Sequence, residues 1–251
     1  RKASSKEKIK AQNTSEIGTE IENMHEKIVE VNQEMESSLT SNNKGVHNDK
    51  FCKKELKEHI QILYTNADGL SNKIDELNTR INETFPEIIA ICETKLNDDI
   101  GNEAMPKNYT IIRKDRSRGR GGGVCIMVRE DLNSKVCTDL NCVDTGNTEH
   151  LWCEISTKDG INMIVIGLIY RPPNNNYEDD SKLNSLLIAA EQQTIKKQLL
   201  VLGDFNYPDI RWDIGDAQSG TKQEEFMKTI NDLYWLQNVN DVTRVRVNNK
   251  P

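Results

Sequence analysis

Five polar side chains stand at or just after the ends of apolar runs in this sequence, and their types fit one kind of chemistry. They are Asn66, Glu93, Tyr170, Asp204 and Asn206. One carboxylate can bind a hard cation such as Mg²⁺, and a second can deprotonate a water. Amide groups and a tyrosine hydroxyl can donate hydrogen bonds to phosphate oxygens as negative charge builds there. The set predicts metal-assisted phosphodiester hydrolysis, although Gly-Asp, as in Gly203-Asp204, is also an ordinary turn dipeptide.

The apolar runs predict the strands that position these side chains. The expected strands cover residues 59–65, 87–92, 109–113, 123–128, 151–156, 161–170 and 199–202. Amphipathic spacing predicts helices from an N-cap at Ser71 to Pro86, over 181–197 and over 224–236. Four consecutive strands between residues 109 and 170 imply antiparallel pairing, so the α/β fold is not a simple doubly wound parallel sheet.

Composition narrows the class of protein. The 251 residues carry a net charge of −7, so any nucleic-acid surface must be local. The six cysteines form no Cys-x-x-Cys motif, which favours free thiols in a reducing compartment over a disulfide framework or a zinc site. No apolar run is long enough to span a membrane, and no secretion signal opens the chain. We therefore expect a nuclear or cytoplasmic location without a membrane partner.

The first part of the chain differs from the rest in composition. We expect a polar leader over residues 1–36, a linker over 37–57 and one globular domain over 58–251. Within the leader, apolar residues alternate at spacings of four and three, which is the pattern of a short coiled coil. They are Ile17, Ile21, Met24, Ile28, Val31 and Met35. Such a seam could form a homodimer, and the alternative is a marginal amphipathic helix in a disordered leader.

Five stretches in a fixed order carry a family resemblance: residues 64–70, 90–96, 121–124, 167–173 and 202–206. Together they closely resemble the endonuclease domain of non-LTR (LINE-type, jockey-like) retrotransposons, a branch of the endonuclease/exonuclease/phosphatase superfamily. The resemblance spans roughly residues 58–251. It implies a four-layer α/β sandwich, in which two mostly antiparallel sheets pack face to face between outer helices.

The resemblance also implies a role for each site residue. Glu93 matches the metal-binding glutamate, with Mg²⁺ as the expected cofactor, and Asn66 matches an asparagine beside the metal and phosphate. Tyr170 resembles a tyrosine that contacts the scissile phosphate. Asp204 resembles the aspartate that activates water, and Asn206 an asparagine that holds the phosphate.

DNA is the partner that the resemblance implies. The basic stretch 113–120 is the best local candidate for contact with the DNA backbone, and a solvated hairpin loop is the alternative. The expected DNA-binding residues are Arg116, Arg118, Arg120, Arg171 and Thr243.

One departure from the family pattern concerns the C-terminal end. The family closes with a Ser-Asp-His-type motif, and this sequence shows none, so we expect a domain that lacks its last strands and has weakened activity. Two other hypotheses remain open. One is a catalytically inactive nuclease-like interaction module dimerised by its N-terminal helix, and the other is a hydrolase of a different phosphodiester, such as a phosphoinositide.

Overall fold

The computed structural model describes residues 60–97, 100–102, 105–116, 121–158, 160, 163–212 and 214–239. Its strands are β1 (Ile62–Asn66), β2 (Ile88–Cys92), β3 (Tyr109–Lys114), β4 (Val124–Arg129), β5 (Leu132–Val136), β6 (Glu149–Thr157), β7 (Met163–Tyr170) and β8 (Gln198–Asp204). Its helices are η1 (Leu70–Asn72), α2 (Ile74–Thr84), α3 (Thr138–Asn141), α4 (Tyr177–Gln193) and α5 (Lys222–Asp232). The predicted N-terminal seam, Arg118, Arg120 and Thr243 lie outside the described residues.

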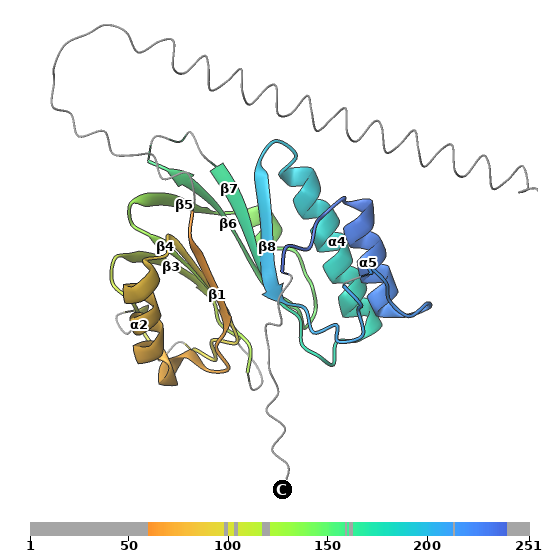
Figure 1. Cartoon of the computed structure of the whole chain (residues 1–251), viewed down its shortest axis with the longest axis horizontal. Coiled ribbons are helices and arrows are strands. Elements are labelled where there is room, and N and C mark those ends of the chain that lie inside the picture. Colours follow the sequence, from red (N-terminus) through yellow and green to blue (C-terminus); the bar gives the residue numbers. More distant parts are fainter. Residues whose placement is uncertain are drawn as a thin grey trace, which may run out of the picture. The chain divides into compact units, whose positions relative to one another are not determined.

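The strands form two sheets of four, in the orders β1-β2-β4-β3 and β5-β6-β7-β8. The pairs β1/β2 and β7/β8 are parallel, and the other pairs are antiparallel. The sheets pack face to face, with β2 against β7 and β1 against β8 (Figure 1). The predicted sandwich of two mostly antiparallel sheets is therefore confirmed.

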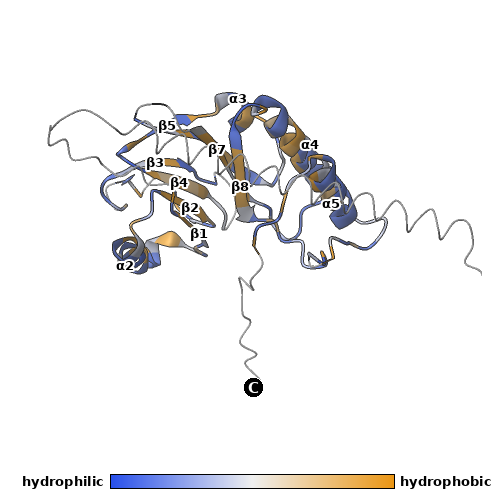
Figure 2. Ribbon diagram, turned by 45° about the horizontal axis from the view of Figure 1, so that its top comes forward, coloured by the Kyte–Doolittle hydropathy of each residue, from blue (hydrophilic) through white to orange (hydrophobic). Residues whose placement is uncertain are grey.

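Three apolar cores separate the four layers. The central core lies between the sheets and includes Ile126 from β4 and Ile166 from β7, both fully buried. A second core packs α2 on the first sheet, and a third packs α3, α4 and α5 on the second sheet. The strands are accordingly coloured as hydrophobic over much of their length, whereas the helices carry both hydrophobic and hydrophilic residues (Figure 2).

Several local boundaries differ from the sequence prediction, among them those of the last helix, α5, which covers Lys222–Asp232 and not 224–236. Strand β5 and helix α3 were not predicted. The five residues of β5, Leu-Asn-Ser-Lys-Val, are mostly polar and none is fully buried, so they show no apolar pattern, and α3 has only four residues. Ser71 is not a helix N-cap, since the backbone N–H groups of Gly69 and Leu70 bond to the turn after β2 and draw the chain into the 3-10 turn η1. Helix α4 begins at Tyr177, four residues earlier than predicted, after the N-cap Asn176, whose Oδ1 accepts the N–H of Asp179 at 2.8 Å.

No helix in the described part of the chain is both long and apolar enough to cross a membrane.

Candidate active site

The parallel strand pairs bring the predicted site residues to one edge of the sandwich. Asn66 ends β1 beside Cys92 of β2, and Tyr170 ends β7 beside Asp204 of β8. Parallel partners end on the same side of a sheet, and the two sheets stack with β1 against β8. The four strand ends therefore meet on the side where β1 and β8 end in Figure 1.

Asn66 connects the two carboxylates of the site. Its Nδ2 donates one hydrogen bond to Oε1 of Glu93 at 2.8 Å and another to Oδ2 of Asp204 at 2.9 Å. All three side chains are half-buried. One amide group thus holds a glutamate from the first sheet and an aspartate from the second within reach of each other, as the sequence predicted for a common site.

Glu93 stands in a strained turn that three glycines support. Its φ is +52°, in the left-handed region that few residues other than glycine and asparagine adopt. The next two N–H groups, of Thr94 and Lys95, donate to the carbonyls of Gly123 and Gly122 at 3.1 and 2.8 Å. A Cβ on Gly123 would lie only 2.4 Å from Oγ1 of Thr94. The Gly121–Gly123 motif therefore allows the backbone to approach the Glu93 turn closely.

Asp204 depends on another close approach. A Cβ on Gly203 would lie 2.1 Å from the carbonyl oxygen of Ile169 on β7. Glycine is required there because of this contact between strands and not because of a left-handed φ, since Gly203 is absent from the positive-φ glycines of the described chain. The strand pair can then set Asp204 beside Tyr170.

Asn206 and Arg171 build the loop after β8. Nδ2 of Asn206 donates to the carbonyl of Arg171 at 2.8 Å, and Nη1 of Arg171 donates to the carbonyls of Phe205 and Asn206 at 3.3 and 2.9 Å. Asn206 itself has a φ of +48°. The predicted role of Asn206 toward a phosphate stays a prediction, whereas its role in closing this loop is visible.

The prediction that Arg171 contacts DNA is wrong for this fold. Its side chain is fully buried and forms a two-point ion pair with Asp180, with distances of 2.7 and 2.8 Å. Its Cζ also lies 4.0 Å from the centre of the Tyr207 ring. Arg171 therefore positions the loop that carries Asn206 and has no surface to offer a ligand.

Tyr170 lies under an ion pair at the rim of the site. Its side chain is buried, and burial followed by the negative charge of Glu93 raises the pKa of its hydroxyl. Tyr170 therefore remains protonated and able to donate a hydrogen bond at neutral pH. Cζ of Arg116 lies 5.9 Å from the centre of its ring, and Nε of Arg116 donates to Oε1 of Glu149.

Two residues near the site were not predicted. Tyr64 belongs to the same face of β1 as Asn66, and burial, then the charges of Cys92 and Asp204, raises the pKa of its hydroxyl. Glu149 pairs with Tyr170 across β6 and β7, and its Oε2 accepts the N–H of Gly123 at 2.6 Å. The two-residue spacing of Tyr64 from Asn66 was a usable signal. The sequence gives no comparable sign that Glu149 lies opposite Tyr170.

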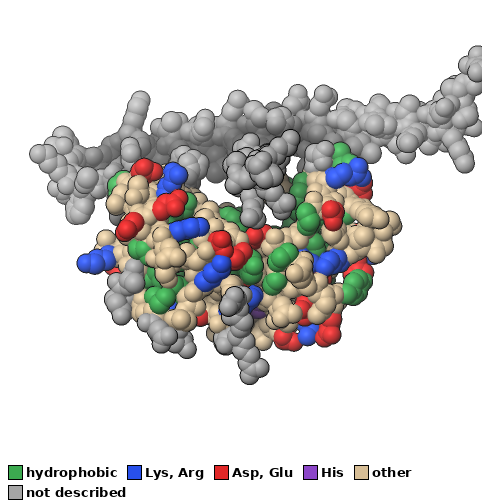
Figure 3. Space-filling view, turned by 90° about the horizontal axis from the view of Figure 1, so that it is seen from below, with side chains coloured by type: hydrophobic (Ala, Val, Ile, Leu, Met, Phe, Trp, Pro, Cys, Tyr) green, Lys and Arg blue, Asp and Glu red, His purple; other side chains and the backbone are tan. Residues whose placement is uncertain are grey.

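The donor set fits a hard divalent cation. Glu93 and Asp204 offer only oxygen ligands, and the described residues contain no group of three His, Cys, Asp or Glu side chains that could hold a metal. Mg²⁺ commonly takes one or two carboxylates and completes its shell with waters and substrate phosphate, whereas structural zinc needs four protein ligands. Figure 3 shows the molecule from the side where β1 and β8 end. Acidic side chains lie near the middle of this face, with Lys and Arg side chains beside them, so the face has a mixed charge.

Comparison with known proteins agrees with this fold. The sequence profile described as "Endonuclease/Exonuclease/phosphatase family" matches residues 57–246. No curated protein sequence matches the chain. The endonuclease domain of TRAS1, a telomere-specific non-LTR retrotransposon, has a similar fold with a TM-score of 0.52 and 16% identity, over 70% of this chain and 71% of that one.

Two further solved structures show how far the likeness extends. The AP endonuclease LMAP from Leishmania major gives a TM-score of 0.51 with 14% identity, over 69% of this chain and 66% of its own. The human Nocturnin catalytic domain gives a TM-score of 0.47 with 15% identity, over 59% of this chain and 64% of its own. The match thus spans about two thirds of the length of these three structures.

Proposed function

Because the chain belongs to the endonuclease/exonuclease/phosphatase family, we propose that it is a Mg²⁺-dependent DNA endonuclease domain of non-LTR retrotransposon origin, which nicks one strand. The observation that carries this proposal is the double hydrogen bond from Asn66 to Glu93 and Asp204. It holds two carboxylates together at a sheet edge, where one can bind a cation and the other can accept a proton from water. The five ordered motifs and the fold similarity to TRAS1 support the retrotransposon origin.

Each side chain has a part in this reaction. Glu93 would hold the divalent cation, which would supply positive charge for the developing charge on the phosphate. Asp204 accepts the proton of the attacking water, whose oxygen forms the new bond to phosphorus as the bond to the leaving oxygen breaks. Asn66 fixes the orientation of both carboxylates. The hydroxyl of Tyr170 donates a hydrogen bond to a non-bridging oxygen, and Asn206 supports the phosphate from the loop after β8.

Contact with the DNA backbone is proposed for Arg116 and, beyond the described residues, for Arg118, Arg120 and Thr243. Arg116 supports this proposal best, because its guanidinium lies over the ring of Tyr170 at the rim of the site. A cation at that position is suited to a phosphate that approaches Tyr170.

The test is nicking of supercoiled plasmid in the presence of Mg²⁺. We expect Asp204→Ala and Glu93→Ala each to lower the rate by at least about 100-fold, because each removes a charged group from the reacting centre. Glu130→Ala is the matched control, since Glu130 is an exposed acidic residue directly after β4. Nicking that persists in both site variants would overturn the proposal.

The two open alternatives give different outcomes in the same assay. A folded protein that leaves the plasmid intact would favour the inactive interaction module. Nicking that a small phosphodiester, such as a phosphoinositide headgroup, suppresses more strongly than DNA would favour the other substrate class.

We also propose the division of the chain into a leader over 1–36, a linker over 37–57 and a domain over 58–251, and homodimer formation through the six apolar residues of the leader. Analytical ultracentrifugation of the full chain tests the dimer, with Ile21→Glu and Ile28→Glu expected to yield a monomer. A full chain that is already monomeric would contradict it.

A further inference from the structure

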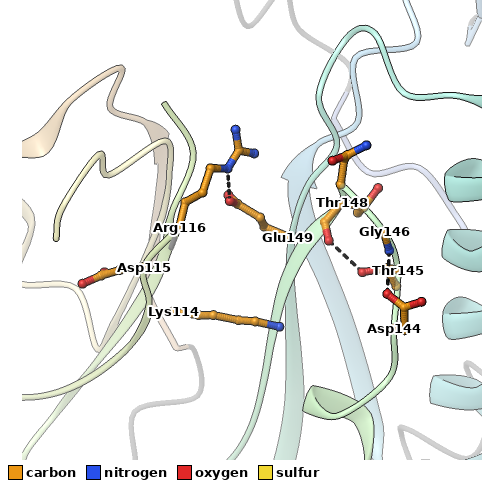
Figure 4. A pocket seen from close by; sticks show the side chains of 9 residues that line it. Lys114, Asp115, Arg116, Asp144, Thr145, Gly146, Thr148 and Glu149 are labelled. Atoms are coloured by element: carbon orange, nitrogen blue, oxygen red, sulfur yellow. Dashed lines mark hydrogen bonds and ion pairs between the residues drawn. The ribbon is translucent and has the colours of Figure 1, made fainter. Parts of the chain in front are cut away.

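A cavity lies beside the candidate active site. It has a volume of about 300 Å³ and is lined between the end of β3 and the loop that leads into β6 (Figure 4). Its lining includes Lys114, Arg116, Thr145, Asn147 and Glu149. Volumes of this order are typical of pockets that hold a small molecule or one unit of a polymer.

The cavity shares a wall with the active site. Glu149, at the start of β6, pairs with Tyr170 at the end of β7. Arg116 lines the cavity, bonds to Glu149 and also lies over the ring of Tyr170 at 5.9 Å. A substrate that reaches Tyr170 therefore passes next to this cavity.

The acidic side chains of the lining are already paired. Asp115 forms an ion pair with Arg113 at 3.0 Å and points away from the cavity (Figure 4). Asp144 accepts from Lys182 at 2.9 Å and from the N–H of Gly146 at 3.0 Å. Glu149 accepts from both Arg116 and the N–H of Gly123. These contacts neutralise the carboxylates that would repel an anion.

Lys114 supplies the charge that remains. Its side chain is exposed and extends toward the interior of the cavity (Figure 4). Within the described part of the chain, Lys114 has no ion-pair partner. An ammonium without an ion-pair partner, over a pocket whose carboxylates are each paired with another group, attracts an anion.

The residues that line the cavity are also unsuited to recognising a base by stacking. The nine described residues of the lining are polar, charged or glycine, and none of them is aromatic, so this described part of the cavity offers no platform on which a base could stack. Hydroxyl, amide and cationic groups suit the sugar and phosphate of a nucleotide.

We propose that this cavity binds the phosphate of the nucleotide next to the cleaved bond, with Lys114 as its main cation and Arg116 as the wall that separates it from the scissile phosphate. This inference rests on the proposed DNA substrate. It adds a binding subsite that the five residues of the catalytic set do not include.

The first measurement is DNA binding by fluorescence anisotropy in EDTA, where no hydrolysis occurs. We expect Lys114→Ala to weaken binding about 3- to 10-fold and to reduce the slope of log K against log salt by about 1, as the loss of one phosphate contact predicts. Lys114→Arg should retain most of the affinity, since it keeps the charge. Lys158→Ala is the control, because Lys158 is an exposed lysine that follows the far end of β6.

The second measurement locates the contact. Duplexes with one neutral methylphosphonate at each position in turn are cleaved in Mg²⁺ and the products are mapped. The parent chain should show reduced cleavage when the phosphate next to the cleaved bond is neutral, and Lys114→Ala should lose this sensitivity at that position alone.

Three outcomes decide between the proposals. The proposed subsite would be overturned if Lys114→Ala left the slope of log K against log salt unchanged. It would also be overturned if a neutral methylphosphonate reduced cleavage equally at every position. A parent chain that binds DNA through Lys114 without nicking it would overturn the proposed hydrolysis and keep the cavity as a phosphate site. A chain that neither binds nor nicks DNA would overturn both.

Discussion

Asn66 and Asp204 are 138 residues apart in the chain, yet Nδ2 of Asn66 donates a hydrogen bond to Oδ2 of Asp204 at 2.9 Å. The same nitrogen donates to Glu93, so one neutral amide separates two carboxylates of like charge. The contact links the ends of β1 and β8, the outer strands of two different sheets.

Replacing Asn66 tests this link. Asn66→Ala removes the donor shared by Glu93 and Asp204 and should lower the nicking rate by about 100-fold, in the range seen when one fixed donor is lost from a reacting centre. Single-turnover nicking with saturating protein separates this loss from weaker DNA binding. Asn72→Ala is the control, since Asn72 is an exposed asparagine at the end of η1. A rate that drops equally in both variants would argue against a special role for Asn66.

The buried pair Arg171–Asp180 should be important for stability. Asp180→Ala leaves the guanidinium of Arg171 buried without its carboxylate, which should lower the free energy of unfolding by about 3–5 kcal/mol. Urea denaturation at neutral pH measures the change. The exposed Asp232→Ala at the end of α5 should shift the free energy by less than about 0.5 kcal/mol. A similar small shift for Asp180→Ala would contradict the structural role of this pair.

Gly203→Ala should damage both stability and activity. The added Cβ meets backbone and not a movable side chain, so β8 must shift away from β7. We expect a loss of about 1–3 kcal/mol in the free energy of unfolding and a clear loss of nicking, because Asp204 follows directly. Gly160→Ala, where a Cβ meets nothing within 4 Å, controls for the substitution itself, although its φ of +73° adds a small strain. Normal nicking by Gly203→Ala would show that the approach of the strands is not needed.

His150 should make the protein less stable in mild acid. Burial, then the nearby charge of Lys114, lowers the pKa of His150 to about 4 from its ordinary 6.5. As the pH falls below about 6.5, the unfolded chain binds a proton that the folded chain excludes, so stability is lost until the pH passes below about 4. The loss between pH 7.5 and pH 5 should be about 2 kcal/mol.

The variant His150→Gln isolates this effect. Glutamine keeps a donor that can reach the carbonyl of Val143, which Nε2 of His150 contacts at 3.0 Å, but it does not titrate. Urea midpoints measured from pH 7.5 to pH 5 should fall less steeply in this variant than in the parent chain. Equal slopes would assign the acid sensitivity to other groups.

The sequence by itself determined which residue types stand at the strand ends. Alternating and continuous apolar runs predicted seven of the eight strands, and the polar residues that end them supplied Asn66, Glu93, Tyr170 and Asp204 as candidates. These features are local, because the periodicity of a strand and the residue that ends it lie within a few positions of each other. Strand β5 escaped notice because an edge strand with little burial leaves no apolar pattern.

Only the tertiary structure decided which of these residues meet and which charges are buried. Arg171 and Arg116 look alike in sequence, but one is buried against Asp180 and the other lies over Tyr170 at the rim of the site. The closeness of Glu149 to Tyr170, and the need for glycine at position 203, likewise come from strand pairing. The physical reason is that burial and ion pairing depend on contacts between segments far apart in the chain, which local periodicity does not record.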